Sequence, residues 1–255
     1  MIYDLKNEIA RPDYPMDHRE SAEKRKVLYH YCSLKAAERI VSTRTIRLNC
    51  VKNYGNSPTS KYEVSGIIEQ HQKLVFIGSF SSEPNSKQLW ADFADGKHGA
   101  RIGFIKAAPF HDVVIDKSKK IRAYSEAGKL LAELGFGISS VLRPAITLNP
   151  NYFTDIVADI SLTDLDYSGT NQSSILCDGI PMLDISSVSK QVEGTYMNEK
   201  EIRIVAVLRG TKSVELSEAI SHLDIPLDFS KCGIEIKFGK KVSTSDKIRI
   251  EAYCK

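Results

Sequence analysis

Strand patterns and helical patterns are interspersed irregularly along this chain, and that arrangement most constrains its fold. The clearest strand is 73–80, and further strands are predicted at 27–31, 45–49, 101–105, 113–115, 120–124 and 201–207. Helices are predicted at 34–42, at 86–94 and around 126–134, the first of them after the N-cap residue Ser33. A doubly wound parallel sheet would need an even alternation of strand and helix, so the pattern predicts an α+β protein with a mixed sheet.

The organisation of the chain predicts one domain over residues 19–255. No low-complexity linker or internal repeat divides the sequence. Residues 1–18 contain two prolines and are expected to form an N-terminal extension. The stretch 233–255 is predicted to form a strand, a turn and a closing helix or strand, whereas 135–192 mixes Gly, Ser and Pro with short apolar runs and gives no assignment.

The composition is typical of a globular protein inside the cell. A hydrophobic content of 42% and a charged content of 26% allow a sizeable core. No apolar run approaches the roughly 18 residues that span a bilayer, and the polar N-terminus is unlike a secretory signal. The five cysteines are scattered without a C-x-x-C pair, which predicts reduced thiols. We therefore expect a cytoplasmic protein without a membrane partner.

Several kinds of chemistry lack their sequence motif. The chain contains no phosphate-binding loop, no G-x-G-x-x-G, no H-E-x-x-H and no G-x-S-x-G. Its six histidines do not pair at metal-ligand spacing, so no metal site is predicted.

Two short segments carry residues suited to chemistry. His30-Tyr31 lies at the exit of the first predicted strand, where side chains can face a ligand. Glu199 and Glu201 begin a late strand and would share one face of it, and carboxylates grouped in this way suit acid–base or cation-stabilising roles. Each segment also has a purely structural explanation: a histidine packed on the core, and a solvated strand end neutralised by Arg203.

Aromatic and hydroxyl side chains provide further candidates. Trp90 and Phe93 share one face of a predicted helix, where they would form an aromatic wall for a planar ligand or pack on the core. Ser79 and Ser81 flank Phe80 at the end of the clearest strand, where they would donate hydrogen bonds to a ligand or simply end the strand.

These segments, in this order, resemble a large bacterial family of uncharacterised domains that opens on a Leu-Tyr-His-Tyr strand and has a late Glu-x-Glu-x-Arg motif. The matching blocks are Leu28–Cys32, Phe80-Ser81, Trp90 with Phe93–Asp95, Gly99–Phe104, Ile121–Tyr124, Glu199 with Glu201 and Arg203, and Gly239–Ile250. The family usually carries an Asn-Asp-Pro-x-x-Glu turn where this chain has residues 53–58, and 135–192 has no counterpart in it.

The layout of that family is similar to the ADP-ribosyltransferase superfamily, which implies a split β-sheet core with flanking helices. Those enzymes carry a His or Arg on a first strand, an aromatic or Ser motif on a second, and a Glu on a later strand. Cleavage of the nicotinamide–ribose bond of NAD passes through an oxocarbenium-like cation, as in glycoside hydrolysis. A fixed carboxylate beside the ribose stabilises that cation.

The resemblance implies an NAD site with catalytic roles for Glu201, Glu199 and His30. Glu201 would be the catalytic carboxylate, Glu199 would orient the acceptor, and His30 would hold a ribose hydroxyl. The remaining side chains would bind NAD or support the carboxylate: Tyr31, Ser79, Ser81, Trp90, Phe93 and Arg203.

Among the supporting side chains, the resemblance gives three a specific role. The ring of Tyr31 or Phe93 would stack on nicotinamide, and Ser81 would support the catalytic carboxylate.

The resulting prediction is an NAD-dependent ADP-ribosyltransferase that acts as a bacterial toxin or phage-defence effector. NAD would be its co-substrate, and the acceptor would be RNA, DNA or protein. A cognate antitoxin or inhibitor protein would be a further partner. Basic stretches at 19–47, 97–122 and 230–255 favour a nucleic-acid acceptor.

Two alternatives remain open. The first is a non-catalytic nucleic-acid- or partner-binding module, whose contacts through Arg44, Arg47 and Lys119-Lys120 would be sensitive to salt. The second is a cysteine-based enzyme, since Cys32 and His30 would share one strand face.

Overall fold

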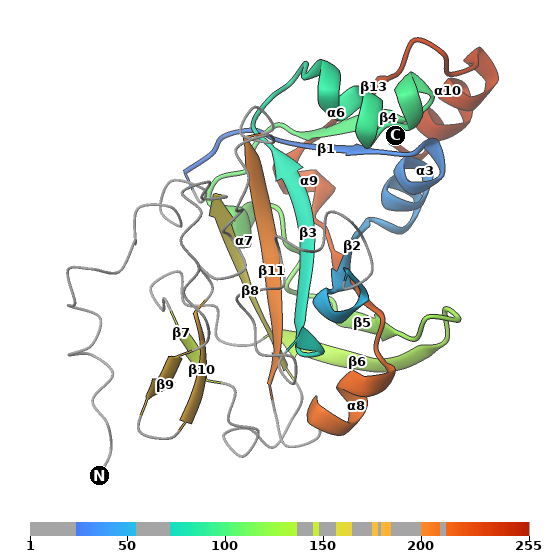
Figure 1. Ribbon diagram of the computed structural model, residues 1–255. Coiled ribbons are helices and arrows are strands. Elements are labelled where there is room, and N and C mark those ends of the chain that lie inside the picture. The colour runs from blue at the N-terminus through green and yellow to red at the C-terminus, as the bar shows by residue number, and fades with distance from the viewer. Residues whose placement is uncertain are drawn as a thin grey trace.

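The computed structural model describes residues 24–54, 72–136, 145–147, 157–164, 175–177, 180–184, 200–209 and 213–254. These residues form a mixed α+β structure with one large, mostly antiparallel sheet and a few helices, which confirms the predicted class (Figure 1). No helix in these ranges is long and apolar enough to cross a membrane. The predicted extension, residues 1–18, lies outside them.

The large sheet contains most of the strands. They are β1 (Leu28–Cys32), β2 (Thr45–Cys50), β3 (Val75–Ser81), β4 (Ala100–Phe104), β5 (Ile121–Tyr124), β6 (Leu130–Phe136), β8 (Val157–Asp164), β11 (Glu201–Arg209), β12 (His222–Pro226) and β13 (Ile234–Phe238). A separate three-stranded sheet consists of β7 (Ala145–Thr147), β10 (Ile180–Asp184) and β9 (Ile175–Cys177), in that order.

The helices are short, and all but α10 and η6 fall between strands in the chain order. They are α3 (Leu34–Thr43), α6 (Lys87–Asp92), α7 (Phe110–Val113), α8 (Ser213–Ala219), α9 (Phe229–Cys232) and α10 (Thr244–Glu251), with 3₁₀ turns η1 (Val51–Tyr54), η2 (Asp95–Lys97) and η6 (Ala252–Cys254).

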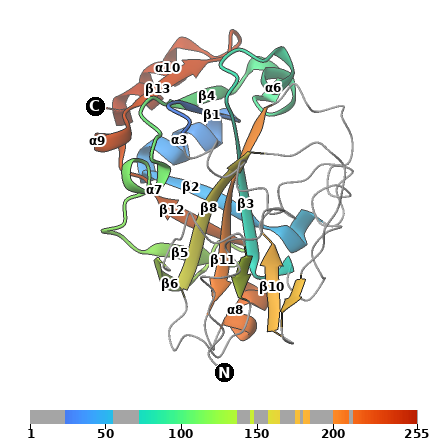
Figure 2. The ribbon, with the colours of Figure 1, turned by 90° about the vertical axis from the view of Figure 1, so that its left-hand side faces the viewer.

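Most of the large sheet closes into a ring. The strands follow the order β11-β8-β6-β5-β12-β2-β3, and β11 pairs with β3 to complete the circle. The sheet then continues from β3 through β1 and β4 to β13. These last strands run across one end of β3 and β11 (Figures 1 and 2). The ring and this three-stranded extension therefore meet at β3.

Strand β3 has a different partner along each part of its edges. One edge pairs with β11 throughout, from Val75 to Ser81. The other edge pairs with β2 at Phe76 and Ile77, and with β1 at Ser81. Strands β1 and β2 therefore diverge alongside residues 78–80 of β3.

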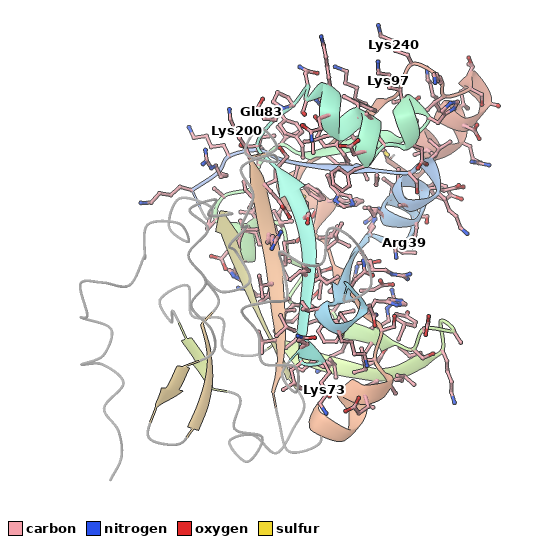
Figure 3. The ribbon with its side chains drawn as sticks, in the orientation of Figure 1. Arg39, Lys73, Glu83, Lys97, Lys200 and Lys240 are labelled. Carbon is pink, nitrogen blue, oxygen red and sulfur yellow. The ribbon has the colours of Figure 1, made fainter. Side chains whose placement is uncertain are left out.

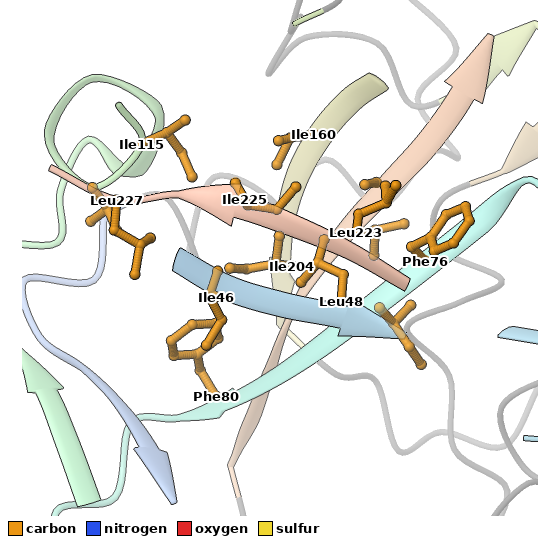
Figure 4. Close-up of a cluster of buried hydrophobic side chains, with 14 of the residues drawn as sticks. Ile46, Leu48, Phe76, Phe80, Ile115, Ile160, Ile204, Leu223, Ile225 and Leu227 are labelled. Atoms are coloured by element: carbon orange, nitrogen blue, oxygen red, sulfur yellow. The ribbon is translucent and has the colours of Figure 1, made fainter. Parts of the chain in front are cut away.

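The main core fills the ring. Figure 4 shows apolar side chains from β2, β3, β8, β11 and β12 meeting there, and each is at most 2% exposed: Ile46, Leu48, Phe76, Phe80, Ile160, Ile204, Leu223 and Ile225. Since side chains alternate across a strand, the residues between them face away from this core. Ser79, Glu201 and Arg203 are among those outward-facing residues.

The first two predicted helices are confirmed, with their caps. The Ser33 hydroxyl accepts from the Ala36 amide at 3.2 Å, and α3 ends at Arg44 in the left-handed conformation. The Ser86 hydroxyl caps α6 in the same way, by accepting from the Leu89 amide at 3.2 Å. These caps satisfy amides that the first turn of a helix leaves unpaired.

Two predicted elements are wrong. In place of the expected strand at 113–115, α7 ends at Val113 with Val114 as its C-cap, and only Ile115 is extended, in a single antiparallel bridge to Leu227. The expected helix at 126–134 contains strand β6, because its residues pair with β5 after a turn closed by the Ser125 and Lys129 backbones. Tertiary pairing thus overrides the helix propensity of the Leu-Leu-Ala-Glu-Leu run.

Candidate functional site

Three of the residues singled out in the sequence lie on neighbouring strands. His30 lies on β1, Ser79 on β3 and Glu201 on β11, and β3 lies between the other two strands. Forty-nine residues separate His30 from Ser79, and 122 separate Ser79 from Glu201. The sheet order alone therefore makes these residues neighbours.

The Glu201 carboxylate is held by two side chains. Ser79 donates its hydroxyl to Glu201 Oε1 at 2.5 Å, while Arg203 donates Nε to Oε1 at 2.9 Å and Nη2 to Oε2 at 3.2 Å. The Arg203 side chain is 0% exposed and that of Glu201 is 10% exposed. Charge-assisted and bidentate bonds of this kind fix the carboxylate in one orientation.

His30 contacts the same serine through its backbone. Its Nδ1 lies 2.9 Å from the Ser79 carbonyl oxygen. Because a carbonyl only accepts, Nδ1 is the donor and carries a proton. Burial lowers the pKa of His30, the Ser79 carbonyl opposes this, and the positive charge of Arg39 lowers it further. A ring that is neutral at pH 7 presents Nε2 as an acceptor, which suits a ligand hydroxyl.

Ser79 contacts both predicted catalytic groups, but on opposite faces of β3. Its carbonyl accepts from the imidazole of His30, which packs against Phe80 on the core side. Its hydroxyl holds the carboxylate of Glu201 on the other side, so the two side chains do not face a common ligand. The His30 ring also lies 5.4 Å from the Phe80 ring, between centroids, which limits its freedom to turn.

Ser79 supports the Glu201 carboxylate, a role that was expected of Ser81. Ser81 is 2% exposed, lies opposite Glu201 in the strand register, and its hydroxyl accepts from the Glu83 amide at 2.9 Å. The supporting role of Ser81 stays a prediction. Glu199 lies outside the described residues, so its shared face with Glu201 stays a prediction.

The predicted aromatic residues form a separate cluster. Tyr31 faces away from the side of β1 that carries His30, and its ring packs edge-on against Trp90 with centroids 5.5 Å apart. Tyr31 donates its hydroxyl to the Glu83 carbonyl at 2.7 Å. Both rings are buried, whereas Phe93, at the end of α6, is 48% exposed. Phe93 is therefore the predicted ring most open to a ligand.

No known family, curated protein or solved structure matches this chain. Its own side chains are the basis for any function. Within the described ranges, no three His, Cys, Asp or Glu side chains are grouped so that they could hold a metal ion.

The cysteine-based alternative finds little support in the structure. Cys32 is buried, and burial raises its pKa to about 12. The thiolate is the nucleophilic form of cysteine, and almost none of it would be present at pH 7.

One ion pair beside the site was missed by sequence reasoning. Lys200 precedes β11 in a left-handed conformation, with φ of 44°, and its ammonium pairs with the Glu83 carboxylate beyond the end of β3 (Figure 3). The Ser82 amide also donates to the Lys200 carbonyl at 3.3 Å. These contacts hold the start of β11 against the end of β3, and Glu201 is the first residue of β11. The position of Lys200 between two glutamates was the available signal.

Proposed function

We propose that this protein is an NAD-dependent ADP-ribosyltransferase, in which Glu201 is the catalytic carboxylate. The observation that carries this proposal is the fixed orientation of the Glu201 carboxylate, to which Ser79 and Arg203 both donate. The order β1, β3, β11 also places a histidine strand, a serine strand and a glutamate strand side by side. An ADP-ribosyltransferase-like split sheet is part of the proposal.

The proposed reaction breaks the bond between ribose C1′ and the nicotinamide nitrogen. Nicotinamide leaves with the bonding electron pair, and positive charge develops at C1′ and the ring oxygen. An acceptor oxygen or nitrogen then forms a bond to C1′ and loses a proton. Glu201 stabilises the developing cation, and it needs no reorientation because Ser79 and Arg203 already hold it.

The remaining assignments belong to the same proposal. Glu199 orients the acceptor, which is RNA, DNA or protein, and Phe93 supplies the ring for nicotinamide in preference to the buried Tyr31. The physiological role is that of a bacterial toxin or phage-defence effector in the cytoplasm, held in check by an antitoxin or inhibitor protein.

The alternative of a basic nucleic-acid-binding module has weaker support. Arg47 pairs with Asp224, with 3.1 Å between Nε and Oδ1, and Lys119 pairs with Asp116 at 3.1 Å. Two of the four basic residues named for that module thus already have a carboxylate partner within the protein.

The decisive experiment measures nicotinamide release from NAD in the presence of RNA, DNA or cell extract. Glu201→Gln preserves the shape of the side chain and should lower the rate by about 10²–10³-fold, the usual loss on removing a preorganised electrostatic group. The matched control is Glu218→Gln, which alters an exposed carboxylate paired with Lys73 and should leave the rate unchanged. Thermal melts would verify that both variants fold.

A second pair of variants tests the role of Ser79. Ser79→Ala should lower kcat because the Glu201 carboxylate loses a hydrogen bond, and Ser81→Ala tests whether the neighbouring hydroxyl supports the carboxylate as well. The proposal fails if the wild-type protein neither gains thermal stability from millimolar NAD nor releases nicotinamide with any of these acceptors.

A further inference from the structure

A second polar site lies on the outer face of β2 and β12, and we call it the arginine site. It consists of Arg39, Arg47, His222 and Asp224. Strand β12 lies between β2 and β5, and Asp224 faces Arg47 in the register of β2. Arg39 reaches the same carboxylate from α3 (Figure 3). None of these residues takes part in the contacts around Ser79 and Glu201.

The arginine site has more positive than negative charge. Arg47 Nε lies 3.1 Å from Asp224 Oδ1, and Arg39 Nη1 lies 3.6 Å from the same oxygen. Two guanidinium groups therefore share one carboxylate. The Asp224 side chain is 9% exposed, whereas those of Arg39 and Arg47 are 27% and 34% exposed. The side chains of both arginines are thus more exposed than the carboxylate that they share.

The two arginines repel each other despite that carboxylate. Burial lowers the pKa of Arg39, and the charge of Arg47 lowers it further, while Asp224 acts in the opposite direction. An anion bound between the guanidinium groups would relieve this repulsion.

Two buried nitrogen atoms at the site have no hydrogen-bond partner among the described residues. They are Arg39 Nη1 and His222 Nε2. His222 is 5% exposed and its ring stacks on Tyr124, with centroids 5.2 Å apart and planes 13° apart. Arg39 Nη1 lies 3.6 Å from Asp224 Oδ1, too far for a hydrogen bond. Buried polar atoms in proteins are nearly always hydrogen-bonded to protein, water or ligand, so these two nitrogens favour a further ligand at the site.

We propose that Arg39 and Arg47 bind a phosphate group, with His222 alongside it. A guanidinium offers five N–H donors in a planar fork, and two forks supply more donors than a single carboxylate ligand can accept. A phosphate group has three or more acceptor oxygens and up to two negative charges, and arginine pairs with it in bidentate fashion. This site does not depend on the activity proposed above.

The phosphate group has two potential sources, which share this chemistry. One is the diphosphate of NAD, because Arg39 is close enough to His30 for its charge to affect that ring. The other is the phosphate of a separate nucleotide. Competition between pyrophosphate and NAD distinguishes them: displacement assigns the site to NAD, and simultaneous binding assigns it to a separate ligand.

Calorimetric titration of the full chain with pyrophosphate, at constant ionic strength, tests the proposal. Arg39→Met and Arg47→Met should each weaken binding at least tenfold, and Arg47→Lys should retain part of it because it keeps the charge without the fork. The matched control is Arg249→Met, which removes another arginine paired with carboxylates, those of Glu38 and Asp246, and should leave binding unchanged.

A gain-of-affinity variant guards against a loss that merely reflects misfolding. Asp224→Asn removes the anion that competes for both guanidinium groups, so pyrophosphate should bind several-fold more tightly. The proposal is overturned if wild-type protein does not bind millimolar pyrophosphate, if Arg249→Met weakens binding as much as Arg39→Met, or if Asp224→Asn fails to tighten it.

Discussion

Replacing Arg203 by Met should strongly destabilise the protein. Arg203 is 0% exposed and makes two charge-assisted hydrogen bonds with Glu201, which is itself 10% exposed. Met fills much of the same volume but leaves the carboxylate without those bonds. Removal of one partner from a buried ion pair typically costs about 3–5 kcal/mol.

Urea denaturation, followed by circular dichroism, measures this cost. For a chain of this size we take a slope of about 3 kcal/mol per molar urea, at the upper end of the range for small proteins. A loss of about 3–5 kcal/mol then lowers the midpoint by roughly 1–1.7 M. Arg249→Met is the control, because its partly exposed pairs should contribute at most about 1 kcal/mol.

A double variant shows whether the lost stability comes from the Glu201 carboxylate that Arg203→Met leaves without its arginine partner. Arg203→Met with Glu201→Gln removes both charges, so it should recover about 2–3 kcal/mol relative to the sum of the single changes. A cost below about 1 kcal/mol for Arg203→Met, or strict additivity in the double variant, would show that the pair behaves as a solvated surface contact.

Three further outcomes follow from burial and close packing. Gly99→Ala should destabilise the protein by about 1–3 kcal/mol in urea denaturation, because the added Cβ would lie 2.2 Å from the Cys32 carbonyl oxygen. Stability should fall as the pH drops from 6.5 toward about 4, because burial lowers the pKa of His222 in the folded protein to about 4 and the unfolded chain is protonated first. Urea titrations at stepped pH measure this slope, and His222→Phe should make it shallower. The pKa of His30 is also lowered, so His30 contributes to the slope in the same direction. Iodoacetamide at pH 8 should modify exposed Cys254 well before Cys32, as read by peptide mass mapping.

The sequence correctly predicted the helices and strands whose formation depends mainly on residues close together in the chain. Ser33 was recognisable as an N-cap because a hydroxyl before an amphipathic run can accept from the free amides of the first turn, whereas Ser86 was taken as the first helical residue and is the N-cap of α6. The Val75–Ser81 and Glu201–Arg209 strands were recognisable from their runs of β-branched and aromatic residues. Strand β6 was mistaken for a helix because its residues favour a helix, and only pairing with β5 makes them extended.

The sequence predicted which residues belong to the site better than it predicted how they contact one another. His30, Ser79 and Glu201 were all candidates, but their mutual contacts depend on β3 lying between β1 and β11, and no local pattern encodes that order. Ser79 and Ser81 share one strand face, so the sequence could not tell which hydroxyl reaches the carboxylate. Arg39 gave no signal at all, since a polar residue on the outer side of an amphipathic helix is ordinary.

The closure of the ring by β11 has a consequence for how the protein folds during synthesis. Strand β3 is completed on one edge only when β11 arrives, and the contact between Ser79 and Glu201 spans 122 residues. A ribosome adding about 5–20 residues per second takes several seconds or more to supply that partner. During this time one of the most apolar strands of the chain has an unpaired edge that other chains can join. Chaperone binding to the nascent chain, or slow ring closure after release, is therefore expected to govern how much of the protein reaches its native state.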